Sequence, residues 1–267
     1  MLCADRLGTK SYTHIVEPKF EIAHAAESGL AQDMARLETG EPIQYVLGKA
    51  EFCGRTFKVK PGVLIPRPET ELLCREAVKV AERMVRQRRA YGKGLVRILD
   101  LCTGSGCIAW TMYLDVPGSE VVGVDISDET LSVAFSQRFE NSDKKGPQIS
   151  FVHGDLLQPE IFPEIGKFDM ILSNPPYIME SEKTNMRKNV LDHEPSLALF
   201  VPDDDPLIFY RSVASISKRL LLPDGCGLVE INEVLGPQTR DVFKEEGFRT
   251  VEIVKDFNDR NRFVKFA

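Results

Sequence analysis

The chain has 267 residues, 43% of them hydrophobic and 28% charged, which suits one large globular domain or one medium domain with a small appendage. No apolar run reaches membrane-spanning length and the N-terminus lacks the apolar core of a secretory signal, so we expect a cytoplasmic protein with no membrane partner. The net charge is −6, and residues 96–267 hold 28 Asp and Glu against 18 Lys and Arg, which disfavours a protein whose main task is to grip duplex nucleic acid.

The first 95 residues predict a small helical segment and a hairpin ahead of a longer helix. Residues 20–39 place Ala, Leu, Met and charged residues at helical spacing, and Gly40–Pro42 end this pattern. Aromatic and β-branched residues with interspersed glycines over residues 44–65 predict a short hairpin or linker. Residues 70–89 predict a helix that is capped on entry by its Pro-Glu-Thr segment. We therefore expect three parts: a helical N-terminal domain over 1–42, a hairpin linker over 43–69 and a larger domain over 70–267.

From residue 96 the chain alternates between short apolar runs and helical patterns. Strands are predicted over VRILDL, EVVGVDIS, ISFVHGD, FDMILSN, GLVEIN, VEIVKDF and NRFVKFA. Helices are predicted over CIAWTMYL, from Asp128 to about Glu140, from about Pro206 to Leu222, and over PQTRDVFKEEGF. Strands that alternate with helices imply an α/β fold with a parallel, doubly wound sheet, here of seven strands. The short link between the last two strands predicts that they pair antiparallel at one edge.

The turn after the first of these strands is rich in glycine. It follows Asp100 and comprises Cys102, Thr103, Gly104, Ser105 and Gly106. Glycines allow a sharp turn and a close approach of a ligand, and the carboxyl end of the first strand is where doubly wound sheets bind nucleotides. Such a turn alone is compatible with NAD, FAD, another adenosine compound or a structural role.

Acidic residues at the ends of three successive strands narrow the choice of cofactor. Asp125 ends the second strand, where a carboxylate can accept hydrogen bonds from two ribose hydroxyls. Asp155 follows the third strand, where it can read an adenine amino group. With no pyrophosphate to bind, acidic surroundings suit the positively charged sulfonium of S-adenosylmethionine (SAM). Neither a C-x-x-C pair nor a His-rich segment occurs, so we expect no metal.

The fourth strand ends in the sequence Asn174, Pro175, Pro176, Tyr177. Consecutive prolines lack N–H groups and hold φ at about −65°, so this loop is rigid. The Asn174 side-chain oxygen and the Pro175 carbonyl can accept both N–H groups of a planar nitrogen and return electron density to it. Tyr177 can stack on the flat acceptor group. These residues suit methyl transfer to an amide or aromatic amine by orientation, without a strong general base. The alternative is that the loop is only a turn.

Together, the motifs resemble a known family. They are PIQYVLG, EF-x-G, LIPRPETE, DLCTGSGCIA, VDIS, GDL, NPPY, EPSLALF and the closing R-x-F-V. They are similar to those of the HemK-type protein glutamine methyltransferases, and in particular of the bacterial release factor glutamine methyltransferases. The match runs from Pro42 to the C-terminus. NPPY is shared with several adenine and guanine N-methyltransferases, whereas LIPRPETE is much more specific.

The resemblance implies a SAM-dependent methyltransferase domain over 70–267 and a small helical N-terminal domain that helps to dock the substrate protein. The substrate would be the glutamine of the Gly-Gly-Gln loop of class 1 peptide chain release factors, and the product N5-methylglutamine. Residues Cys102–Gly106 would line the amino-acid end of the cofactor. Asp125 would hold the ribose, and Asp155 with Leu156 would face the adenine.

The resemblance also assigns the acceptor side of the site. Asn174 would touch both cofactor and substrate, and the segment Asn174–Tyr177 would cradle the glutamine amide. Arg67 and Glu69 of the LIPRPETE segment would wall the site. The chain departs from the family at Cys102, where glycine is usual, and in its short N-terminal segment.

Two other functions use the same residues. A nucleic-acid adenine N6-methyltransferase would place a flipped base in the pocket, but little of this chain is left for a basic recognition domain. A non-catalytic SAM-sensing protein could keep the fold, but the intact TGSG turn, Asp125 and NPPY favour activity.

Overall fold

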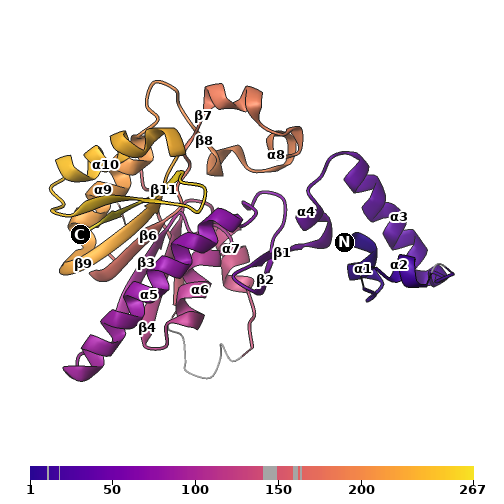
Figure 1. Cartoon of the computed structure of the whole chain (residues 1–267), viewed down its shortest axis with the longest axis horizontal. Coiled ribbons are helices and arrows are strands. Elements are labelled where there is room, and N and C mark those ends of the chain that lie inside the picture. Colours follow the sequence, from indigo (N-terminus) through magenta and orange to yellow (C-terminus); the bar gives the residue numbers. More distant parts are fainter. Residues whose placement is uncertain (11, 18, 141–148, 159–161, 163) are drawn as a thin grey trace.

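The structure is a computed structural model that describes residues 1–10, 12–17, 19–140, 149–158, 162 and 164–267. The N-terminal part contains α1 (Leu2–Arg6), α2 (Thr13–Val16), α3 (His24–Glu38) and α4 (Ile43–Leu47). A hairpin of β1 (Lys49–Phe52) and β2 (Arg55–Lys58) follows. In Figure 1 the N-terminal helices lie to one side of the main sheet and the hairpin lies between them and the sheet. None of the described helices is both long and apolar enough to cross a membrane.

Helix α4 is a difference from the expected hairpin or linker over residues 44–65. It has only five residues, too few for a periodic signal, and it ends at Gly48 in the left-handed conformation, a common helix terminator. Tertiary contacts hold it: Tyr45 is buried and its hydroxyl donates to the Val63 carbonyl over 2.7 Å. The helices α1 and α2 were not predicted either, because they are also too short to give a periodic signal.

The long helix α5 (Pro68–Ala90) begins two residues before the predicted start. The N-cap residue, Arg67, makes no side-chain capping hydrogen bond. The Pro-Glu-Thr segment therefore stabilises the start of the helix in a different way from the expected cap. Pro68 occupies the first turn, where a missing N–H costs nothing, and Glu69 and Glu71 place negative charge at the positive end of the helix dipole.

The main sheet has seven strands in the order β10-β11-β9-β6-β3-β4-β5. Their bounds are β3 (Val96–Leu101), β4 (Ser119–Asp125), β5 (Ile149–His153), β6 (Phe168–Ser173), β9 (Leu221–Glu230), β10 (Val251–Lys255) and β11 (Asn261–Phe266). Strands β3, β4, β5, β6 and β9 are parallel, and β11 is antiparallel to both β9 and β10. The predicted parallel sheet with an antiparallel hairpin at one edge is confirmed.

The remaining elements connect these strands. Among the described residues they are α6 (Cys107–Asp115), α7 (Asp128–Ser136), α8 (Lys188–His193), α9 (Ile208–Leu220), α10 (Gly236–Glu245), the short parallel pair β7 (Ile178–Met179) and β8 (Phe200–Val201), and 3-10 helices at Glu180–Asn185, Ser196–Ala198 and Glu233–Leu235. Helix α7 ends four residues before the predicted Glu140. Gln137 is pulled out of the helix because its buried amide bonds with the backbone of Lys58 and Ser105.

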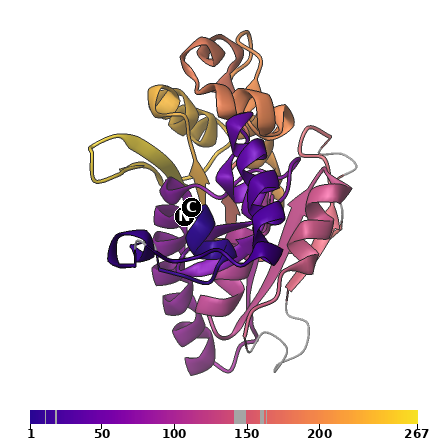
Figure 2. The ribbon, with the colours of Figure 1, turned by 90° about the vertical axis from the view of Figure 1, so that its right-hand side faces the viewer.

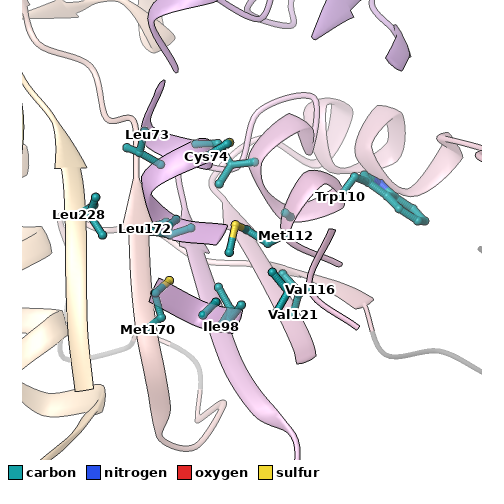
Figure 3. Close-up of a cluster of buried hydrophobic side chains, with 14 of the residues drawn as sticks. Leu73, Cys74, Ile98, Trp110, Met112, Val116, Val121, Met170, Leu172 and Leu228 are labelled. Atoms are coloured by element: carbon teal, nitrogen blue, oxygen red, sulfur yellow. The ribbon is translucent and has the colours of Figure 1, made fainter. Parts of the chain in front are cut away.

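Two apolar cores lie on opposite faces of the sheet. Alternate residues of β3 point to each: Val96 and Ile98 pack with α5 and α6, whereas Leu99 and Leu101 pack with α9 and α10. Figure 3 shows the first core, in which Leu73 and Cys74 of α5 lie over strand residues such as Leu172. The turned view in Figure 2 shows the sheet enclosed between helices. Burial on both faces explains why the strands read as continuous apolar runs.

The antiparallel edge depends on a glycine. Gly227 of β9 pairs with Phe266 of β11, and a Cβ at this position would lie 2.1 Å from the Phe266 ring, which is itself stacked on Phe243. We expect Gly227→Ala to lower the free energy of unfolding by about 1–3 kcal/mol, because the packed ring must move. Urea denaturation checks this. The matched change Gly29→Ala, on an exposed helix position with open space, should stabilise by about 0.5–1 kcal/mol; equal effects of the two changes would contradict the steric explanation.

Candidate active site

The carboxyl ends of β3, β4 and β6 meet at one edge of the sheet. β3 is central, and the chain crosses from it to β4 on one side and, later, to β6 on the other. The loops after these strands therefore diverge around a crevice, the usual ligand position in doubly wound sheets. This topology brings together the Gly-rich turn, Asp125 and the Asn174–Tyr177 loop, which are far apart in the sequence.

A buried carboxylate builds the Gly-rich turn. One oxygen of Asp100 accepts hydrogen bonds from the Thr103 hydroxyl (2.5 Å) and the Ala109 N–H (3.1 Å). Its other oxygen has no partner among the described residues, and burial raises the pKa of Asp100 to about 7. Gly106 has φ of 79°, and a Cβ there would lie 2.9 Å from the Trp110 ring. Asp100 therefore fixes the shape of the turn from below.

A cavity of about 170 Å³ lies above this turn. It is lined by Gly62, Leu64, Cys102, Gly104, Asp125, Ile126, Ser127, Thr130, Gly154, Asp155, Leu156, Leu157, Asn174, Pro176, Pro195, Leu197, Ala198 and Phe209. Of the predicted cofactor residues, Cys102, Gly104, Asp125, Asp155, Leu156 and Asn174 line it. Thr103, Ser105 and Gly106 do not; they are buried and support the turn. Acids beside aliphatic side chains suit an adenosine group.

Backbone donors fix both acids of this cavity. Asp125 accepts the N–H groups of Gly104 (2.9 Å) and Ser127 (3.1 Å), one on each oxygen. Asp155 accepts the Leu157 N–H (2.8 Å) on one oxygen. Burial, as the largest cause, raises the pKa of Asp125 despite these bonds. Asp125 is thus a preoriented acceptor in the lining of the cavity.

Cys102 has a left-handed backbone conformation, which explains why glycine is usual at this position in the family. Its φ is 59°, in the left-handed region that L residues other than Asn and Asp rarely adopt. Its side chain packs against the core on the α9 side, and Cys102 lines the 170 Å³ cavity. The chain therefore keeps the strained turn and fills the space beside it with a small thiol.

This strain predicts an order of stabilities. We expect Cys102→Val to lower the free energy of unfolding by about 1–2 kcal/mol, because a β-branched side chain tolerates this φ least. Cys102→Gly should stay within about 1 kcal/mol of wild type, because relief of strain offsets lost packing. Urea denaturation of both variants measures the difference. A Val variant as stable as the Gly variant would show that the backbone relaxes.

A second cavity of about 150 Å³ adjoins the first. It is lined by Leu64, Arg67, Asn174, Pro175, Tyr177, Ile178, Met186, Val190, Ala198 and Leu199. Leu64, Asn174 and Ala198 line both cavities, so they form the wall between them. Of the predicted substrate residues, Pro176 lines only the first cavity and Glu69 lines neither.

Buried carboxylates that sequence reasoning missed support the second cavity. Glu194 accepts from Arg67 (2.7 Å) and from the Ile65 N–H (3.3 Å), which joins the LIPRPETE segment to EPSLALF. Glu230 accepts from Thr70 (2.7 Å) and Tyr177 (3.1 Å). The signal for Glu230 was present in the sequence, because an acid within the apolar strand GLVEIN requires a partner when buried.

The largest cavity described lies elsewhere. It measures about 770 Å³ and is formed by the β1–β2 turn, α5 and the β10–β11 turn, with Cys53, Glu71 and Phe257 in its lining. It includes none of the strand-end residues predicted to bind a ligand. Size alone therefore does not identify the site; the convergence of strand ends does.

Comparison with known proteins gives the family. A protein named release factor glutamine methyltransferase from Bacteroides thetaiotaomicron is 38% identical over 264 residues, which cover 99% of this chain and 89% of that protein. One of the same name from Flavobacterium psychrophilum is 37% identical over 87% of this chain and 77% of its own length. The chain belongs to the release factor glutamine methyltransferase family.

A domain model and solved structures of methyltransferases also match the chain. The Methyltransferase small domain matches residues 80–196. A methyltransferase from Pyrococcus furiosus has a TM-score of 0.50 at 15% identity, over 88% of this chain and 98% of that one. A 16S rRNA N2 G1207 methyltransferase from T. thermophilus, solved with AdoMet and guanosine, also scores 0.50 at 18% identity, over 82% and 49% of the two chains. These likenesses show the fold alone.

As a member of the release factor glutamine methyltransferase family, this protein is a SAM-dependent methyltransferase. The predicted fold, family, enzyme class and cofactor are thereby confirmed. Glutamine methylation is favoured over adenine methylation, and an enzyme over a non-catalytic SAM sensor. The roles assigned to individual residues and the domain bounds 1–42, 43–69 and 70–267 remain predictions.

Proposed function

We propose that the enzyme methylates the side-chain amide nitrogen of the glutamine in the Gly-Gly-Gln loop of class 1 peptide chain release factors. The observation that carries this proposal is the pair of adjoining cavities that share Asn174 as a wall. One has the acids and apolar surfaces that suit the adenosine of SAM. The other is small, largely apolar and bordered by the Asn174–Tyr177 loop, as a single side-chain amide requires.

The residues of the second cavity orient the acceptor. The oxygen of the Asn174 carboxamide and the Pro175 carbonyl accept the two N–H groups of the glutamine amide, which localises the lone pair on nitrogen. Tyr177 provides a flat apolar surface, and its hydroxyl is held by Glu230. Bound SAM supplies an activated methyl group on a sulfonium. The amide nitrogen becomes far more acidic once it carries a fourth substituent, so a strong base is not needed to remove its proton.

The remaining parts have proposed roles as well. Residues 1–42 would help to dock the release factor, residues 43–69 would link this segment to the catalytic part, and residues 70–267 would carry the chemistry. Arg67, held by buried Glu194, would wall the acceptor cavity. Glu69 is exposed and lies outside both cavities, so we assign it to the first turn of α5 rather than to substrate contact. The proposed place of action is the cytoplasm, where release factors act.

Mass spectrometry tests the proposal directly. Purified enzyme is incubated with SAM and a class 1 release factor, and the Gly-Gly-Gln peptide is then examined. We expect a gain of one methyl group on glutamine, and no gain in a release factor in which that glutamine is replaced by glutamate. A parallel incubation of the enzyme with labelled SAM and DNA or RNA tests the alternative nucleic-acid substrate. Methyl transfer to nucleic acid but not to the release factor would overturn the proposal.

A further inference from the structure

A buried carboxylate lies directly behind the acceptor loop. Glu230, the last residue of β9, is 1% exposed. Its Oε2 accepts the hydroxyl of Thr70 (2.7 Å) and its Oε1 accepts the hydroxyl of Tyr177 (3.1 Å). Thr70 lies in the first turn of α5 and Tyr177 in the loop after β6. One carboxylate therefore joins three segments that are distant in the sequence.

The Thr70 hydroxyl transmits this arrangement to Asn174. Asn174 donates from Nδ2 to Thr70 Oγ1 over 3.1 Å. A hydroxyl has one proton, and the proton of Thr70 is committed to Glu230. Thr70 can therefore only accept from Asn174, and the carboxamide must present its NH₂ group to Thr70. Its oxygen is left for the side on which Asn174 lines the two cavities.

We propose that Glu230, acting through Thr70, is a positioning residue that fixes which way the Asn174 carboxamide faces. This inference rests on the proposed function, because the oxygen of Asn174 is the group that accepts the amide N–H of the substrate. If the Thr70 proton were not bonded to Glu230, Thr70 could donate to the Asn174 oxygen. The NH₂ group of Asn174 would then face the amide nitrogen of the substrate. An NH₂ group there meets another N–H and cannot bind it.

The same carboxylate holds the other end of the acceptor loop. Tyr177 is fixed by Glu230 at its hydroxyl and by Asn232 at its backbone carbonyl (3.1 Å). Asn232 also donates to Glu182 (2.9 Å), and its N–H is accepted by the Tyr210 hydroxyl (2.9 Å). The loop is thus braced from β9 at both Asn174 and Tyr177, which holds the two ends of the acceptor cavity in one geometry.

Protonation of Glu230 should disrupt this arrangement. Burial is the largest influence and raises its pKa to about 7; the hydroxyls of Thr70 and Tyr177 and the charge of Arg262 lower it, and the charge of Glu69 raises it. Below this pH the protonated carboxyl can donate to Thr70, which frees the Thr70 proton for Asn174. Activity that depends on Glu230 should therefore be present above pH 7 and lost as the pH falls through 7.

Steady-state kinetics of Thr70 variants test the proposal. We expect Thr70→Val to lower kcat roughly 10-fold while the Kd for SAM changes less than about twofold, since one oriented hydrogen bond is lost. Thr70→Ser, which keeps the hydroxyl, should recover most of kcat. Thr239→Val is a matched control, because Thr239 is equally buried on α10 and its hydroxyl has no partner in the described part of the chain. Equal kcat in Val and Ser variants of Thr70 would overturn the proposal.

A second measurement needs no release factor, because it observes the Asn174 side chain directly. In protein labelled with ¹⁵N-asparagine, the side-chain NH₂ signals of Asn174, identified by their loss in Asn174→Ala, should shift with a midpoint near pH 7 in wild type and stay fixed in Glu230→Gln. Asn174 signals that shift with pH in the same way in wild type and in Glu230→Gln would overturn the proposal that Glu230 acts on Asn174 through Thr70. If wild type leaves the release factor unmodified, the proposed function fails, while these signals still decide the inference about Glu230.

Discussion

Replacement of Asn174 by alanine should lower kcat by about 10²–10³-fold, the usual cost of removing one preorganised group that stabilises a transition state. In the proposed mechanism the side-chain oxygen is the acceptor that, with the Pro175 carbonyl, draws electron density onto the glutamine nitrogen. This interaction strengthens as the nitrogen gains positive charge in the transition state. Its loss should therefore lower kcat more than it changes KM. Transfer of labelled methyl to the release factor measures both constants.

The fold and most of the SAM affinity should survive this change. Asn174 is half-buried at the boundary of two cavities, and its described hydrogen bond is the one to Thr70. Thermal unfolding and SAM titration of Asn174→Ala should therefore resemble wild type. Asn258→Ala, an exposed asparagine in the β10–β11 turn, is the control and should keep full kcat. An Asn174→Ala enzyme with wild-type kcat would refute the assigned role in orienting the acceptor.

Replacement of Asp125 by alanine should instead weaken SAM binding first, by about 10²–10⁴-fold in Kd. Hydrogen bonds to charged groups contribute about 1.5–3 kcal/mol each, and a carboxylate facing both ribose hydroxyls loses two. The change also frees the N–H groups of Gly104 and Ser127, which Asp125 now accepts. The turn that lines the cavity should therefore lose order together with the ribose contact.

Isothermal titration with SAM and with S-adenosylhomocysteine checks this expectation, because both carry the same ribose and should weaken equally. Asp224→Ala removes an exposed acid near the opposite end of the sheet, in β9, and serves as the control with unchanged affinity. Wild-type affinity in Asp125→Ala would contradict the ribose assignment. A loss confined to SAM would show that the carboxylate acts on the sulfonium and not on the ribose.

The fold was predictable where local pattern and burial coincide. The central strands β3, β4 and β6 are apolar runs because both faces of the sheet are covered there. The alternation of strands with helices along the chain implied parallel pairing. Prediction was weakest where tertiary contacts overrode local preference. Gln137 leaves a helical pattern to bond with Lys58 and Ser105, and the five-residue α4 is held by the buried Tyr45.

By itself, the sequence determined the chemistry that each loop can offer: a glycine turn, acids at strand ends, and a rigid loop with an amide and a ring. These properties belong to residue type and spacing along one segment. Only the tertiary structure decided that Cys102 and Gly104 line the cavity while Thr103 and Ser105 support it. It alone placed Glu230 behind Thr70 and Tyr177. The physical reason is that a hydrogen bond depends on distance and direction in space, and residues 70, 177 and 230 acquire both only when α5, the loop after β6 and β9 pack together.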